Sequence, residues 1–433
     1  MKLSKHKLGE LIEVTRGASL SGQFYAEEGE LIRLTLGNFN MNGGGFKENT
    51  SKTDLYYTGT VKDEFILNKG DIITPLTEQS LGLLGTTARI PENGKYIQSQ
   101  DVALVKCKEG LLDPNFCYYL ISSSIVRQQL SAGAQQTKIR HTSPDKIKDC
   151  TVWVPEFEEQ KRIGRILTDI DEKITLNRQI NDNLEAMAKQ LYDYWFVQFD
   201  FPNEEGKPYK SNGGVMVWNE MLKREIPQGW NDCKIKDFMR IFTGKKDASK
   251  AVPGNYKFFS CAPEPISSNE YIYDGYAVLV SGNGSYTGRV GFYKGKFDLY
   301  QRTYACVLDE DEHNISFFYY TLRYLFQPIY SGGKHGSSIP YIVLGDLADF
   351  RFAFNETICT KFVDAAKPMF DEQLLRQKEI EALTKQRDEL LPLLMNGQAT
   401  VNYHLPARTD IPILNLQNLH YTANTIKISI TFS

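Results

Sequence analysis

The amino-acid sequence predicts a mixed α/β protein in which two related globular domains are separated by two long helices. Two segments of about forty residues, 158–200 and 356–400, have apolar residues at the spacing of an amphipathic helix. Several short motifs of the first half return in the same order in the second half. We therefore expect globular domains at 1–157 and 201–355, long helices at 158–200 and 356–400, and a tail at 401–433.

Each globular domain mixes strand-like and helix-like segments. Residues 71–74 and 102–105 in the first half, and 276–280 and 304–308 in the second, are short runs rich in β-branched and other apolar residues. Residues 115–130 and 315–330 have the spacing of amphipathic helices. Strands and short helices in each half predict the α/β class.

The first long helix is predicted from an uninterrupted apolar stripe. Pro155 precedes the segment, where a helix tolerates proline, and 158–197 would span about 60 Å at the rise of an α-helix. A helix of that length is expected to lie along a partner of similar length. The stripe consists of Ile163, Leu167, Ile170, Ile174, Leu184 and Leu191, together with Ala188 and Trp195.

The second long helix has a matching stripe and ends before Gly397, a residue typical of helix C-termini. Polar residues interrupt both stripes and are typical of positions that set register in a coiled coil; they are Asn177, Asn181, Gln377 and Thr384. The alternative is two amphipathic helices of ordinary domains, but the matched lengths favour a helix pair. The second stripe consists of Val363, Phe370, Leu374, Leu391 and Leu394, together with Ala366 and Ile380.

An internal repeat supports a tandem duplication of globular domain plus helix. Gly133 and Gly333, Ile139 and Ile339, and Asp149 and Asp349 are each 200 residues apart. The segment 7–17 is similar to 234–244, and 116–120 is similar to 317–322. Five such pairings in one order indicate duplication rather than chance, whereas the connecting loops differ between the halves.

Composition narrows the functional classes. The net charge is −3, yet 127–148 and 240–257 are locally basic, as a phosphate-binding surface requires. Seven cysteines occur without CxxC spacing, which is typical of reduced thiols in a cytoplasmic protein. We expect no secretory signal, because charges are mixed throughout the first residues, and the sequence contains no apolar run of membrane length. We expect a cytoplasmic location.

From 155 to 174 the chain reads P-x-x-x-E-Q-K-R-I-x-x-I-L-x-x-I-D-E-K-I, and 390–397 reads LLPLLMNG. In these segments it resembles the specificity subunit of type I restriction–modification systems, and the resemblance covers about residues 5–401. The resemblance implies two target recognition domains that read a bipartite DNA sequence. It also implies two antiparallel coiled-coil helices, related by a pseudo-twofold axis, that space the half-sites. Two methyltransferase subunits and motor–nuclease subunits are the implied partners, beside double-stranded DNA.

Sequence-specific reading of DNA needs Arg or Lys for guanine and Asn or Gln for adenine. Polar loops at corresponding places in the two halves are therefore the candidates. The loops of the first half contribute Thr77, Gln79, Ser80, Gln135, Gln136, Lys138 and Arg140. Those of the second contribute Lys245, Lys246, Asn283, Ser285, Tyr286, Lys334, His335, Ser337 and Ser338. Solvated loops without a ligand are the alternative for each.

We expect no catalysis by this chain. It contains no Pro-Pro pair, which the adenine-binding loop of a methyltransferase needs, and no G-x-x-x-x-G-K-(S/T) phosphate loop. No histidine spacing indicates a metal site. We therefore expect this chain to bind no cofactor, and we expect S-adenosylmethionine, ATP and Mg²⁺ in the partner subunits. The alternative function is a coiled-coil scaffold with two protein-binding domains and no role on DNA.

Aromatic residues gather where the first helix enters the second domain. Two interpretations stay open for them, packing of the helix end against that domain and docking of a methyltransferase subunit. The tail after 401 ends in an alternating segment, typical of an edge strand, for which the sequence indicates no partner. The aromatic residues are Tyr192, Tyr194, Trp195, Phe196, Phe199 and Phe201.

Overall fold

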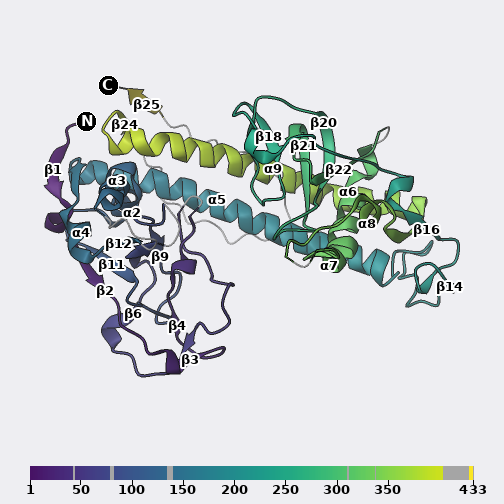
Figure 1. Ribbon diagram of the computed structural model, residues 1–433, viewed down its shortest axis with the longest axis horizontal. Helices are drawn as coiled ribbons and strands as arrows, with labels where there is room; N and C mark the ends of the chain where they lie inside the picture. The colour runs from purple at the N-terminus through teal and green to yellow at the C-terminus, as the bar shows by residue number, and fades with distance from the viewer. Residues whose placement is uncertain are drawn as a thin grey trace. The chain divides into compact units, whose positions relative to one another are not determined.

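The computed structural model describes residues 1–41, 44–78, 82–133, 140–309, 312–336, 338–402 and 429–432. It divides into two compact units, each of which contains part of both long helices (Figure 1). Unit 1 comprises residues 1–176 and 379–433, and unit 2 comprises residues 177–378. The boundary between the two units therefore falls within the long helices, after Leu176 and after Lys378.

Unit 1 is built from short strands in a mixed α/β arrangement. One sheet has the strand order β2-β11-β7-β9, a second has the order β3-β5-β4-β10-β6, and β1-β13 and β8-β12 form separate pairs. The strands are β1 (Ser4–Lys7), β2 (Ile12–Arg16), β3 (Tyr25–Ala26), β4 (Ile32–Arg33), β5 (Tyr56–Tyr57), β6 (Ile66–Leu67), β7 (Ile72–Pro75), β8 (Thr77–Glu78), β9 (Ala88–Arg89), β10 (Tyr96–Ile97), β11 (Val102–Cys107), β12 (Arg140–His141) and β13 (Thr151–Val154).

The helix expected at 115–130 is two helices, α2 (Pro114–Ser122) and α3 (Ser124–Ala132). Ser123 interrupts it in an extended conformation, with its hydroxyl donating to the Leu120 carbonyl at 2.6 Å. Serine hydroxyls compete with the helical hydrogen bonds in this way, a local effect that apolar spacing does not reveal. Unit 1 also contains the short helices α1 (Leu8–Leu11) and α4 (Pro144–Asp149).

Unit 2 has a six-stranded sheet of order β17-β22-β20-β21-β18-β19, with β16-β23 as a separate pair. A hairpin of β14 and β15 follows a turn in which Asp200 accepts hydrogen bonds from the amide and the hydroxyl of Ser211. The strands are β14 (Met216–Asn219), β15 (Arg224–Pro227), β16 (Asn231–Lys234), β17 (Arg240–Thr243), β18 (Tyr256–Phe259), β19 (Ile266–Ser268), β20 (Tyr273–Ser281), β21 (Val290–Leu299), β22 (Thr303–Val307) and β23 (Arg351–Phe354).

The helix expected at 315–330 is confirmed, with a π-helical turn in its middle. It comprises α6 (Ile315–Thr321), the turn Leu322–Phe326 and α7 (Gln327–Tyr330). The remaining short helix of the unit is α8 (Leu344–Ala348). Aromatic side chains of α6 lie in the largest apolar core of unit 2.

Both long helices are continuous. α5 (Phe157–Tyr192) ends in a π-helical turn, Asp193–Val197, and α9 (Glu356–Met395) ends just before Gly397, as expected. In unit 1 the core combines side chains of α2 with stripe residues of both long helices. The stripe residues are Ile163, Leu167, Ile170, Ile174 and Leu394, and Leu391 packs at the margin of the core. In unit 2 the core contains Ala188, Trp195, Val363 and Phe370, with Leu191 and Leu374 at its margin; Leu184 is half-buried.

The aromatic cluster at the end of α5 packs into the core of unit 2. Five of its members are buried there, Tyr192, Trp195, Phe196, Phe199 and Phe201, and Tyr194 is exposed. Tyr192 donates or accepts a hydrogen bond of 2.9 Å with the buried hydroxyl of Thr321. Packing therefore accounts for all but one of these aromatic residues.

The C-terminal strand β25 (Ser429–Phe432) pairs antiparallel with β24 (Ala399–Asn402), which follows α9 directly. The strand expected at the last residues is thus present, and its partner is the segment that directly follows α9. Residues 403–428 lie outside the described part of the chain.

Candidate nucleic-acid interface

In unit 1, segments from four parts of the chain meet at one edge, which we call loop edge 1 (residues 16–18, 76–78, 98–101 and 140–142). The amide of Ala18 donates to the Gln98 carbonyl at 2.9 Å, and Leu76 donates to Asp101 at 2.8 Å. The carbonyl of Leu76 in turn accepts from Thr142 at 2.8 Å. These bonds place two of the loops predicted to bind DNA side by side.

Unit 2 has a corresponding loop edge 2 (residues 244–246, 282–288, 300–303, 333–336 and 338–341). Gly282 donates to the Arg302 carbonyl and accepts from the amide of Ile342, both at 2.9 Å. These two hydrogen bonds correspond to those that Leu76 makes with Asp101 and Thr142 in unit 1. Asn283 and Tyr341 form an isolated β-bridge between the loops that follow.

A glycine permits each edge to close. A Cβ atom at Gly17 would lie 2.2 Å from the Gln98 carbonyl oxygen, and one at Gly244 would lie 1.5 Å from that of Leu299. Real Cβ atoms do not come so close to backbone oxygens, so both positions require glycine. The sequence motifs that end in Gly17 and Gly244 therefore have the same structural role.

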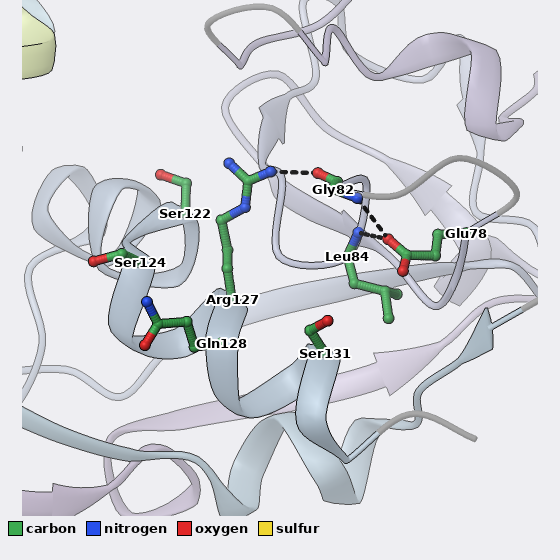
Figure 2. A pocket seen from close by; sticks show the side chains of 8 residues that line it. All are labelled: Glu78, Gly82, Leu84, Ser122, Ser124, Arg127, Gln128 and Ser131. Carbon is green, nitrogen blue, oxygen red and sulfur yellow. Dashed lines mark hydrogen bonds between the residues drawn. The ribbon is translucent and has the colours of Figure 1, made fainter. Parts of the chain in front are cut away.

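Buried polar groups organise loop edge 1 (Figure 2). The Glu78 carboxylate accepts from the amides of Gly82 and Leu84 at 3.2 and 3.0 Å. It also accepts from the amide of Leu83 at 3.0 Å. Its other oxygen lies 3.5 Å from the guanidinium of Arg140. Because that carboxylate is only 3% exposed, its charge requires these partners.

The hollow drawn in Figure 2 has a volume of 350 Å³ and lies between the turn at Gly82–Leu84 and helix α3. Arg127 reaches over it from α3 and donates to the Gly82 carbonyl. Ser122, Ser124 and Gln128 add uncharged polar groups to the wall. The hollow thus offers hydrogen-bonding groups and a cation directly beside loop edge 1.

Several predicted DNA-binding residues have internal partners. The Thr77 hydroxyl is buried and donates to Asp101 at 3.0 Å, and Arg140 donates to Ser131 at 3.0 Å. Lys246 pairs with Glu270 and, at 3.2 Å, with the buried Asp298. The hydrogen bond to Glu270 raises the pKa of the Lys246 ammonium.

Two further predicted residues of loop edge 2 also have internal partners. The Asn283 side-chain oxygen accepts from the Cys261 thiol at 3.1 Å. His335 lies 3.1 Å from Asp346, and its ring stacks on Tyr341 with 5.2 Å between centroids. These groups shape the loop, which leaves less of their hydrogen-bonding capacity for a ligand.

Other predicted residues of loop edge 2 are exposed, namely Lys245, Ser285, Tyr286, Lys334 and Ser338. The Lys334 ammonium lies 4.2 Å from the centroid of the Tyr330 ring. All the described candidates of the second half thus lie on one edge. Gln79, Ser80, Gln135, Gln136, Lys138 and Ser337 lie outside the described residues.

Sequence reasoning missed further exposed side chains at these edges, among them His141, Arg302, Ile339 and Tyr341. Tyr341 and His141 occupy equivalent places in the 200-residue repeat, which is a signal that could have identified them. Arg302 could be found only from the pairing of its carbonyl with Gly282.

Within the described ranges, no group of three or more His, Cys, Asp and Glu side chains could hold a metal ion. Nor does any helix in those ranges have the length and apolar character needed to cross a membrane.

Residues 2–186 and 227–354 match the family model described as the type I restriction modification DNA specificity domain. The MjaIX specificity subunit of a type I restriction enzyme from Methanocaldococcus jannaschii is 25% identical over 324 residues, 68% of this chain and 71% of that protein. The EcoDI specificity subunit from Escherichia coli is 33% identical over 186 residues, 42% of this chain and 41% of that protein.

The fold is similar to a crystal structure of a type I restriction–modification S subunit from M. genitalium. The TM-score is 0.58 at 18% identity, and the match covers 91% of this chain and 96% of that one.

Proposed function

The chain belongs to the type I restriction modification DNA specificity family, and from this premise we propose that it reads duplex DNA through its two loop edges. The observation that carries the proposal is the convergence of the candidate loops at one edge of each unit. Exposed cations at loop edge 2, such as Lys245 and Lys334, suit phosphate contacts, which position a protein on the duplex.

We propose that the DNA target is bipartite, with one half-site for each unit. In support, the order β2-β11-β7-β9 of unit 1 has a counterpart in β17-β22-β20-β21 of unit 2. The pairing of β1 with β13 likewise has a counterpart in β16 with β23. A common scaffold with unlike loops suits two readers of different sequences, a consequence of tandem duplication.

The two long helices are proposed to form an antiparallel coiled-coil pair that spaces the half-sites about a pseudo-twofold axis. In unit 1, Asp171 on α5 accepts from Arg387 on α9 at 2.9 Å. In unit 2, Asn177 accepts from Arg376 at 3.3 Å, and Gln373 donates to Glu185 at 3.1 Å. Residue numbers that rise along α5 while they fall along α9 support the antiparallel direction.

The chain is proposed to act without catalytic chemistry of its own and to direct partner subunits to the target. Two methyltransferase subunits would methylate adenine N6 using S-adenosylmethionine. Motor–nuclease subunits would add cleavage with ATP and Mg²⁺. A cytoplasmic location fits this role, since the cell's DNA is there. The family description, which names DNA specificity, favours this function over a protein-binding scaffold.

Genome-wide mapping of N6-methyladenine, with and without the gene, tests the proposal. We expect one bipartite methylated motif to disappear when the gene is deleted and to return when it is restored. Affinity of the assembled complex for that motif should fall steeply as salt rises, because counterions are released on binding. An unchanged methylation pattern together with salt-independent binding would contradict a role in DNA recognition.

A further inference from the structure

Loop edge 2 exposes several large apolar side chains. Tyr286 is 49% exposed, Ile339 is 63% exposed and Tyr341 is 37% exposed. Val343 and Leu344, which follow in the chain, are also exposed. Scattered surface apolar residues need no explanation, but a group on one ligand-binding edge indicates a contact surface.

Two of the polar candidates at this edge already have internal hydrogen-bond partners. Asn283 already accepts from Cys261, and His335 already pairs with Asp346. Asn is otherwise a common group for reading the edge of adenine. Their internal hydrogen bonds therefore shift base contact toward the neighbouring apolar side chains.

The backbone hydrogen bonds hold the loops that carry Tyr286 and Ile339 next to one another. The amide of Gly284 and the hydroxyl of Thr287 donate to the Pro340 carbonyl at 3.0 and 2.9 Å. Ile339 directly precedes Pro340, and Tyr286 lies within the turn 284–287. The pair is thus carried on two loops that are bonded to each other before any ligand arrives.

Cations flank this pair. Lys334 is exposed on the same loop as Ile339, and Arg302 is exposed on the segment that bonds to Gly282. An apolar centre with cations around it suits the edge of a base pair between two phosphate strands. A purely apolar protein partner would not need the cations.

We propose that Tyr286 and Ile339 recognise the C5-methyl group of a thymine in the major groove of the half-site read by unit 2. This inference rests on the proposed DNA-reading function. Thymine alone among the four bases presents a methyl group in that groove, so an apolar pair can distinguish it from the other bases.

Replacement of thymine by deoxyuridine, one position at a time in that half-site, tests the contact, because only the methyl group is lost. The full-length chain is used in the complex that binds DNA. We expect about a fourfold loss of affinity at one position, the effect of one buried methyl group. Ile339→Ala and Tyr286→Ala should weaken binding to the thymine duplex and abolish its preference over the deoxyuridine duplex.

Leu375→Ala is the matched control, since Leu375 is 56% exposed on α9 and should leave the thymine preference unchanged. Equal affinity for the deoxyuridine and thymine duplexes at every position would overturn the inference, as would a thymine preference that survives in both variants. Either result would leave the proposed function intact. Failure of the complex to bind any duplex specifically would instead overturn the proposed function.

Discussion

Lys245 and Lys246 are adjacent in the chain but differ in their surroundings. Lys245 is exposed, whereas Lys246 pairs with Glu270 and Asp298. If loop edge 2 binds phosphates, Lys245→Ala should weaken DNA binding and reduce the salt slope by about one, the value for one phosphate contact.

Lys246→Ala should instead act on stability, because it leaves the carboxylate of the buried Asp298 without its cation. Its salt slope should match that of the wild-type protein. DNA titrations at several salt concentrations measure both slopes, and equal slopes for the two variants would argue against this assignment.

Asp349 provides a test of pH dependence. Hydrogen bonds from Lys234, at 2.8 Å, and from Lys236 lower the pKa of this carboxyl to about 2. The unfolded chain, with a carboxyl pKa of about 3.9, therefore binds the proton more readily than the folded one. The stabilisation is complete above about pH 4 and is lost as the pH falls toward 2.

Asp349→Asn should accordingly make the free energy of unfolding less sensitive to pH in this acidic range. Denaturant titrations between about pH 2 and 5 measure it. Glu220→Gln removes a carboxylate from an exposed pair with Lys223 and serves as the control. An undiminished pH dependence in Asp349→Asn would refute the role given to these lysines.

At the scale of elements, the approach of α5 to α2 depends on Gly164. Alanine favours a helix over glycine by about 1 kcal/mol, but a Cβ atom there would lie 2.6 Å from the Phe116 amide nitrogen. Overpacking of this kind costs about 1–3 kcal/mol. Gly164→Ala should therefore destabilise unit 1, by up to about 2 kcal/mol, in spite of its better helix propensity.

Gly345→Ala is the matched control in α8, because nothing lies within 4 Å of an added Cβ atom there. It should leave the free energy of unfolding unchanged within about 0.5 kcal/mol or raise it. Urea titrations of both variants make the comparison. A Gly164→Ala protein more stable than wild type would show that α2 yields to the added methyl group.

At the scale of the whole molecule, independent reading predicts a modular target. Replacement of residues 201–355 by the corresponding segment of a relative should change one half-site of the methylated motif and leave the other as it was. The similar order of four strands in the two units motivates this expectation. Mapping of methylated adenines checks it, and a change in both half-sites would refute independent reading.

The helices should set the gap between half-sites. Seven residues inserted into α5 after Leu176 and seven into α9 after Lys378 would lengthen each helix by about 10 Å. That corresponds to about three base pairs at 3.4 Å each. We expect the motif to keep both half-sites with a longer gap, and an unchanged gap in an active complex would rule out the helix pair as the spacer.

The sequence by itself determined the long helices, because a 3.6-residue apolar period over some forty residues is a local property of the chain. It also located the repeat, since motifs such as those ending in Gly17 and Gly244 keep their order. Residue spacing was a poorer guide at Ser123, where a single hydroxyl divides the expected helix into two.

Only the tertiary structure decided which polar residues at the loop edges have internal partners. Lys246 meets Asp298, and Thr77 meets Asp101 and His141, through contacts between segments far apart in the chain. Such partners follow from strand order and register, which local spacing does not encode. The sequence pattern indicated the loops that meet at each edge. Because internal partners depend on the fold, only the structure showed that Tyr286 and Ile339 are among the side chains still exposed there.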